Sequence, residues 1–170
     1  VGLFSVSMVF PRNLGILSSA LSLPYIPLIS EIHSTRPQTL AQVVPRTQSM
    51  FSLFLMIPAF GLAALSRVIV VVLYGEAYSA AWSTLFVLSF YAYLAGVNDT
   101  IGHVLAGTGR MWSGFVLNFL HMSVLLLVGY WLIPPFSYLG AGMSYALASC
   151  FHTMGVYLFV RWWMKIEITH

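Results

Sequence analysis

The chain has 170 residues, of which 59% are hydrophobic and only 6% are charged, against about 25% charged in an average soluble domain. This composition excludes an ordinary soluble protein and favours a polytopic membrane protein. The formal net charge is +3, but so few basic residues make no basic patch, and we therefore expect no nucleic-acid partner.

Five apolar stretches recur along the chain, each long enough to cross a hydrocarbon core of roughly 30 Å, which takes about 20 helical residues. The sequence therefore predicts an all-α membrane fold, a bundle of five transmembrane helices. The expected spans lie at about residues 2–29, 49–74, 82–106, 111–133 and 139–160. No hydrophilic segment between them is long enough to fold alone, so the spans themselves form the fold.

The first expected helix is polar for a lipid-facing one, since it holds several serines, Arg12 and three prolines, Pro11, Pro24 and Pro27. Prolines at membrane depth are tolerated where neighbouring helices, serine side chains or water satisfy the freed carbonyl groups. We therefore expect this helix to bend beside a cavity and to end at Pro27. A polar loop from Ser30 to Gln48 is expected to follow.

The second expected helix carries Arg67 about two turns before its end. Such an arginine either extends to the lipid headgroups or faces a pathway and meets an anionic substrate. Gly75 is suited to cap the C-terminus of this helix. Glu76 then starts the next helix, where the positive end of the helix dipole favours a carboxylate.

The third expected helix is the one around which the chain is organised, because it is apolar enough to span a bilayer and yet contains Asp99. If the helix continues to about residue 106, Asp99 lies in the membrane, where an unpaired carboxylate is costly. If the helix ends near Asn98, Asp99 is interfacial. On a continuous ideal helix, Asp99, His103 and Arg110 would fall within roughly 40° of one another on one face.

The fourth expected helix places Asn118 and His121 three residues apart and therefore on one face, with Gly114 leaving space one turn earlier. Such a patch serves either hydrogen bonding between packed helices or the lining of a wet cavity. In the fifth helix, Gly142 and other small residues favour close helix packing. His152 is interpreted there as a hydrogen-bonded packing residue, with proton handling as the alternative.

The basic residues predict the orientation, because cytoplasmic ends of membrane proteins are enriched in Lys and Arg. With five spans, most of them fall on one side, which we expect to be cytoplasmic and to include the C-terminus: Arg36, Arg46, Arg110, Arg161 and Lys165. The odd number of spans and a start inside a helical pattern suggest a piece of a longer protein.

A series of short motifs occurs in a characteristic order: Leu3-Phe4-Ser5-Val6, Pro27-Leu28-Ile29-Ser30, Ile57-Pro58, Leu73-Tyr74-Gly75 with Tyr78 and Ala80-Ala81, Leu105-Ala106 before Gly109-Arg110, Asn118, and Leu132-Ile133-Pro134 before Leu139-Gly140-Ala141. In this the chain resembles the C-terminal half of polysaccharide or O-antigen flippases of the multidrug/oligosaccharidyl-lipid/polysaccharide exporter superfamily. The resemblance implies a transporter of twelve to fourteen helices, in which two bundles rock to open a central cavity alternately to each side. The missing upstream helices would then be its partners in the same transporter.

The resemblance also implies a function in polysaccharide and lipopolysaccharide biosynthesis in the bacterial cytoplasmic (inner) membrane. There an undecaprenyl-diphosphate-linked oligosaccharide is moved from the inner to the outer face. Asn118 and His121 are candidates for the polar lining of the cavity, and arginine suits the diphosphate because its planar fork binds bidentately. The phosphate candidates are Arg12, Arg67 and Arg110. Asp99 and His103 are candidates for coupling to an H⁺ or Na⁺ gradient, and no other cofactor is expected.

Two other functions compete with the flippase. A multidrug and toxic-compound extrusion antiporter shares the architecture but exports cations and would favour an acidic cavity, whereas basic residues at least match the single acid here. A membrane-anchor or assembly subunit would need only packed helices. An enzyme is not expected, because the sequence shows no Ser/His/Asp set, paired carboxylates, phosphate-binding glycine loop or metal-ligand spacing.

Overall fold

The structure is a computed structural model that describes residues 2–167, with side chains described as far as Trp162. Lys165, one of the residues used to predict the orientation, therefore has its side chain outside the described residues. The described residues are helical throughout apart from short turns, and they contain no strand. The elements are α1 (Gly2–Ser22), α2 (Tyr25–Thr35), the short 3-10 helix η1 (Pro37–Thr39), α3 (Leu40–Ala64), α4 (Ser66–Tyr74), the 3-10 helix η2 (Glu76–Ala81), α5 (Trp82–Gly107) and α6 (Met111–Glu167).

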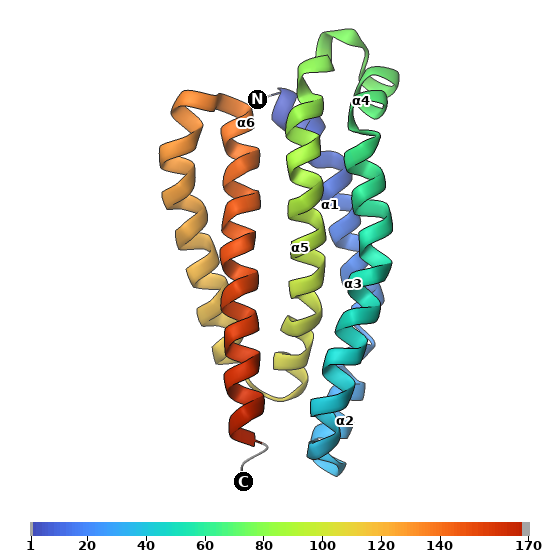
Figure 1. The fold of residues 1–170 in the computed structure, drawn as a ribbon, viewed down its shortest axis with the longest axis vertical. Helices are drawn as coiled ribbons and strands as arrows, with labels where there is room; N and C mark the ends of the chain where they lie inside the picture. Colours follow the sequence, from blue (N-terminus) through green and yellow to red (C-terminus); the bar gives the residue numbers. More distant parts are fainter. Residues whose placement is uncertain (1, 168–170) are drawn as a thin grey trace.

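The helices run along one long axis, and the chain reverses its direction between α2 and α3, between α4 and α5, after α5 and inside α6 (Figure 1). The start of α1, α4 and η2 lie at one end of the bundle, and α2, the turn after α5 and the end of α6 lie at the other. Helix α5 is central, because it packs against α1, α2, α3 and α6. The side chains that α5 carries are therefore the ones best placed to meet groups from several other helices.

The first helical rod breaks after Ser22, five residues before the expected end at Pro27. Helix α1 ends at Ser22, and α2 begins at Tyr25 with Pro27 inside its first turn. Proline is tolerated there because the first turn of a helix has no internal partner for its N–H groups. The polar loop expected between Ser30 and Gln48 is also wrong: this segment is helical on both sides of Arg36, where the chain turns.

The second rod also has a break, at Leu65 between α3 and α4. After α4, Gly75 has φ 84°, a conformation that glycine adopts without strain, and Glu76 opens η2. Both residues therefore lie where the sequence predicted a cap followed by a helix start.

Helix α6 is folded into a hairpin at Ser137, whose φ of 50° and ψ of −123° are not helical. Residues 111–136 form its first limb and residues 138–167 its second, and the two limbs run side by side in opposite directions (Figure 1). Pro134 and Pro135 come just before this turn. The reversal falls inside the expected connection between the fourth and fifth spans.

Small side chains let the helices approach α5 closely. A Cβ added to Gly96 on α5 would lie 2.8 Å from Leu55 Cδ1 of α3 and 3.0 Å from Ser18 Oγ of α1. Ser18 also donates a hydrogen bond to the Gly96 carbonyl at 3.2 Å. On the other side, Gly142 of α6 approaches Thr84, to whose Cγ2 an added Cβ would be 2.9 Å distant.

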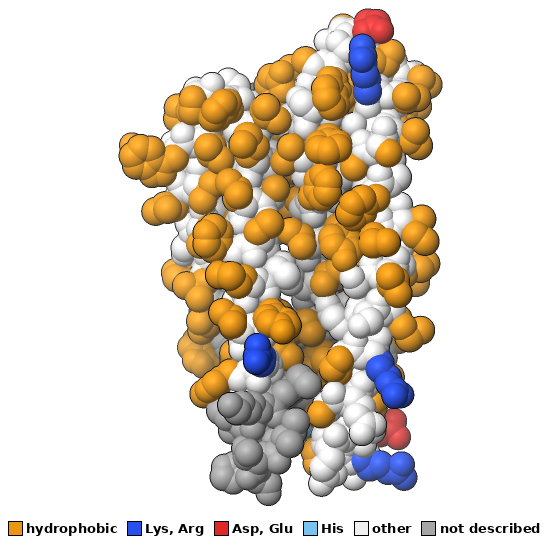
Figure 2. All heavy atoms as spheres, viewed as in Figure 1, with side chains coloured by type: hydrophobic (Ala, Val, Ile, Leu, Met, Phe, Trp, Pro, Cys, Tyr) orange, Lys and Arg blue, Asp and Glu red, His pale blue; other side chains and the backbone are white. Residues whose placement is uncertain are grey.

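The outside of the bundle is strongly apolar. Large hydrophobic side chains remain exposed along all the long helices, among them Phe54, Leu126 and Tyr157. On the face shown in Figure 2, hydrophobic side chains cover most of the length and charged side chains lie near the two ends. Four helical segments, 2–35, 37–64, 76–107 and 111–162, are long and apolar enough to cross a membrane.

Candidate functional site: a polar hollow between α5 and α6

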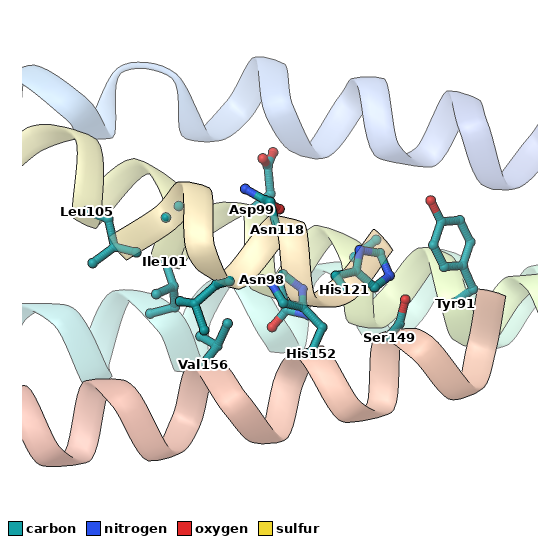
Figure 3. A pocket seen from close by; sticks show the side chains of 14 residues that line it. Tyr91, Asn98, Asp99, Ile101, Leu105, Asn118, His121, Ser149, His152 and Val156 are labelled. Carbon is teal, nitrogen blue, oxygen red and sulfur yellow. The ribbon is translucent and has the colours of Figure 1, made fainter. Parts of the chain in front are cut away.

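Helix α5 and the two limbs of α6 line a partly open hollow of about 180 Å³, at whose edge Asn118 is exposed. Most of its wall is apolar, but polar side chains reach it from all three helical segments (Figure 3). Helix α5 contributes Tyr91, Asn98 and Asp99, the first limb of α6 contributes Asn118 and His121, and the second limb contributes Ser149 and His152.

His121 and His152 face each other across the α6 hairpin. Their ring centroids are 4.9 Å apart and the ring planes differ by 15°, which is a stacked arrangement. Both side chains are half-buried. The Nε2 atom of His121 is buried and has no hydrogen-bond partner among the described residues, so one polar atom of the pair remains available to a ligand, a proton or water.

Asp99 lies within α5, which continues for two more turns to Gly107. This matches the longer of the two helix placements that the sequence left open. Its carboxylate points towards α1 (Figure 3), where Ser19 Oγ donates a hydrogen bond to Asp99 Oδ2 at 2.7 Å. Asp99 is therefore both part of the wall of the hollow and a link between α1 and α5.

A second polar contact fixes the opposite wall. Asn98 is buried, and its Nδ2 donates a hydrogen bond to Thr153 Oγ1 at 2.9 Å. Thr153 in turn donates to the Ser149 carbonyl at 2.8 Å. This chain of hydrogen bonds satisfies the Asn98 amide inside an otherwise apolar contact, and it holds the second limb of α6 against α5.

A neighbouring hollow of about 510 Å³ lies between α1 and α5. Arg12 and Ser19 line it, and it shares Tyr91 and Ala95 with the hollow between α5 and α6. The sequence predicted that the first helix borders a cavity, and α1 does line this hollow. Arg12 is exposed on α1, and a ligand in this second hollow would lie close to its guanidinium group.

The predicted site residues divide into two groups. Asp99, Asn118 and His121 line one hollow, and Arg12 lines the adjoining one. His103, Arg67 and Arg110 line neither. His103 is half-buried on α5 with Nδ1 unpartnered among the described residues, and Arg67 is exposed in the first turn of α4, at the end of the bundle opposite the turn after α5.

Arg110 lies beyond the end of α5, so the helical-face argument does not extend to it. Gly109 has φ 73°, and the Arg110 N–H donates to the Leu105 carbonyl at 2.8 Å while the Gly109 N–H donates to that of Ala106 at 3.1 Å. This is the Schellman arrangement that ends a helix. It turns the chain before Arg110, which therefore does not share the α5 face of Asp99.

Sequence reasoning underestimated His152, Tyr91 and Asn98. For His152 a signal was present, because Ser149, His152 and Val156 are spaced by three and four residues and so share one helical face, and all three line the hollow. No comparable pattern marks Tyr91, whose neighbours in the sequence are apolar or aromatic.

No protein-family model matches the chain, and no curated protein and no solved structure matches it either. What the site can bind is therefore argued from the side chains that line it. Hydroxyl, amide and imidazole groups suit the hydrogen bonding of a polar, hydroxylated ligand. Asp99 is the one carboxylate among the described residues that line the hollow, and these include no Lys or Arg.

Proposed function

We propose that this chain forms part of a flippase that moves an undecaprenyl-diphosphate-linked oligosaccharide across the bacterial cytoplasmic membrane by alternating access. The observation that carries the proposal is the polar hollow inside a bundle whose exterior is apolar. Polar groups inside a membrane-spanning bundle are costly and mark substrate or ion pathways. The motif order of the polysaccharide flippases adds the substrate class.

The hollow supports the oligosaccharide part of this proposal. Sugar hydroxyl groups both donate and accept hydrogen bonds, and Asn118, Ser149 and Tyr91 offer the same dual capacity. The stacked rings of His121 and His152 add a flat surface at one wall. A volume of about 180 Å³ holds only part of a sugar chain, which is consistent with a cavity that other helices of the transporter complete.

The diphosphate requires a cation, and the structure supports Arg12 over the other two candidates. Arg12 lines the hollow that adjoins the polar one. Arg67 lies near the end of the bundle that carries α4, and Arg110 lies in the turn at the other end. We therefore assign Arg12 to the diphosphate, and Arg67 and Arg110 to the two membrane surfaces.

The arrangement of basic residues supports a cytoplasmic C-terminus. Arg36 follows α2, Arg110 follows α5, and both lie at the end of the bundle where α6 ends. By the preference of Lys and Arg for the cytoplasmic side, this end faces the cytoplasm. The lipid tail of the substrate would then remain in the bilayer while its sugar passes through the hollow.

The test is to reconstitute the protein encoded by the complete reading frame into vesicles that contain fluorescent undecaprenyl-diphosphate oligosaccharide. A membrane-impermeant quencher reports the fraction of fluorophore on the outer face. We expect the protein to increase the rate of exchange between leaflets and the variant Arg12→Gln to reduce that rate. Vesicles that show no exchange, but export an organic cation against a proton gradient, would replace the flippase with the extrusion antiporter.

A further inference from the structure

The stacked histidines of the α6 hairpin form a pair whose placement limits how many protons it can take up. His121 and His152 come from opposite limbs of the α6 hairpin and meet inside the hollow with centroids 4.9 Å apart. Two imidazolium charges at that distance repel strongly where little water screens them. The pair can therefore accept one proton much more readily than two.

The surroundings of the pair contain a matching countercharge. The titratable groups that α5 presents to the hollow are Tyr91 and Asp99, and α6 presents the two histidines themselves. From α1, Arg12 lines the adjoining hollow. Asp99 lines the same hollow as the pair, although its carboxylate is turned towards α1. A proton on the pair would attract this carboxylate towards α6, and such ion pairing strengthens as water is excluded.

Asp99 connects this charge to the packing of the helices. Its carboxylate accepts the hydrogen bond from Ser19 of α1, so it can interact either with α1 or with a positively charged ring on the α6 side. A group with two alternative partners on different helices is the kind of two-state element that conformational coupling requires.

We propose that His121 and His152 together form one proton-binding site and that its occupation shifts Asp99 between α1 and the α6 hairpin. The role of this site in transport rests on the proposed function, whereas the existence of the proton site does not. The proton comes from water at one membrane face and binds a ring nitrogen, with the free Nε2 of His121 as the acceptor that the geometry favours. No other bond is made or broken.

The proton site is tested without transport. The chain contains five histidines, few enough to resolve when the protein is labelled with ¹⁵N-histidine and studied in lipid bilayers between about pH 5 and pH 8, where histidine changes charge. We expect the signals of His121 and His152 to change together, in separated steps, as coupled sites do. In H121Q the remaining signal of His152 should follow a simple single-site curve.

Independent single-site curves for the two histidines in the unmodified protein would overturn the proton site. H121F serves as a second variant, since it keeps a stacked aromatic ring but cannot take up a proton. If H121Q does not fold, H121F must give the same single-site curve for His152.

The coupling role is tested in the vesicle assay. We expect H121F and H152Q to lose most of the dependence of exchange on a pH gradient, and H33Q, whose histidine lies on α2 outside the hollow, to keep it. An unchanged gradient dependence in both hollow variants would overturn the coupling. If no variant and no unmodified protein exchanges the lipid, the flippase proposal fails, whereas the titration curves still decide whether the proton site exists.

Discussion

Asp99 both lines the hollow and joins α5 to α1 through a hydrogen bond. It lies inside a mostly apolar helix, and a carboxylate there needs a hydrogen-bond donor. Ser19 of α1 supplies one at 2.7 Å. The contact is half-buried, so its contribution to stability is that of a partly screened hydrogen bond rather than of a fully buried one.

Replacing Ser19 by alanine should therefore lower the free energy of unfolding by about 1 kcal/mol, the usual size of such a bond. The measurement is the unfolding midpoint of the purified protein in detergent. Ser123→Ala is the matched control, because the Ser123 hydroxyl is exposed and bonds only to the Phe119 carbonyl of its own helix. Equal midpoints for the two variants would show that Ser19 does not stabilise Asp99.

At the residue scale, helical spacing predicted part of the site and missed the rest for a physical reason. Asn118 and His121 are three apart in an apolar helix, so their common face was visible in the sequence. That His121 would meet His152 was not visible, because the contact depends on how the two limbs of α6 fold back at Ser137. Arg110 was misplaced because the positive φ of Gly109 ends the helix that the spacing argument assumed.

At the scale of elements, the contact between α2 and α5 depends on Gly107. A Cβ there would lie 2.9 Å from the Ile26 carbonyl oxygen and 2.9 Å from Ile29 Cγ2. The carbonyl belongs to the backbone of α2 and cannot turn aside as a flexible side chain would. The absence of a side chain at Gly107 is what lets α2 lie against the end of α5.

Gly107→Ala should accordingly destabilise the protein by about 1–3 kcal/mol, as overpacking generally does. Gly102→Ala, in the same helix, is the control, since an added Cβ meets nothing within 4 Å there. The control should gain up to about 1 kcal/mol from the better helix propensity of alanine. The measurement is the thermal unfolding midpoint of both variants. A Gly107→Ala variant as stable as Gly102→Ala would contradict the close packing of α2 against α5.

The α6 hairpin depends on a second unusual backbone position. Ser137 adopts φ 50° and ψ −123°, a region that residues with a side chain occupy only at a cost of order 1–3 kcal/mol. Glycine has no such cost, although it loses more chain entropy on folding.

Ser137→Gly is therefore expected to raise stability by about 1 kcal/mol, and Ser137→Val to lower it, because β-branched residues are least compatible with positive φ. In the regular helix of the same hairpin, Ser123→Gly should instead lower stability by about 0.5 kcal/mol. Unfolding midpoints of the three variants test this. A Ser137→Gly variant that loses as much as Ser123→Gly would argue against the strained turn.

A proline and a polar segment account for the differences between the expected and observed elements in the first part of the chain. Pro27 was taken as the end of the first helix, but in the first turn of α2 it removes no helical hydrogen bond. Similarly, polar residues after Ser30 suggested a loop, yet they form the solvent-accessible end of a helical rod that continues to Thr35. Polarity marks where a helix leaves apolar surroundings, which is not necessarily where it ends.

At the scale of the whole molecule, composition alone predicted an all-helical fold, since the apolar runs leave little other way to satisfy the backbone in lipid. It did not predict which helix would be central. Helix α5 has that place because several of its contacts are made through small residues such as Gly96. The direction that we propose for the bundle in a membrane rests on the basic residues at the end opposite α4.

This direction predicts which cysteines are reachable from outside. With the single native cysteine, Cys150, replaced by serine, Ala77→Cys in η2 should react with a membrane-impermeant thiol reagent in intact cells. Ser34→Cys in α2, which is exposed at the other end, should react only after the membrane is opened. The reverse result would invert the proposed orientation.

The central claim is that a wet hollow lies inside an apolar bundle, and one comparison of neighbouring residues tests it most directly. Asn118 lines the hollow, whereas the side chain of Phe119, at nearly the same depth on α6, is 62% exposed on the bundle and does not line the hollow. In native membranes and in the Cys150→Ser background, we expect Asn118→Cys to react with a small water-soluble thiol reagent and Phe119→Cys to remain unreactive, because only the former meets water. Equal reactivity of the two positions, or reaction at Phe119→Cys alone, would contradict the account.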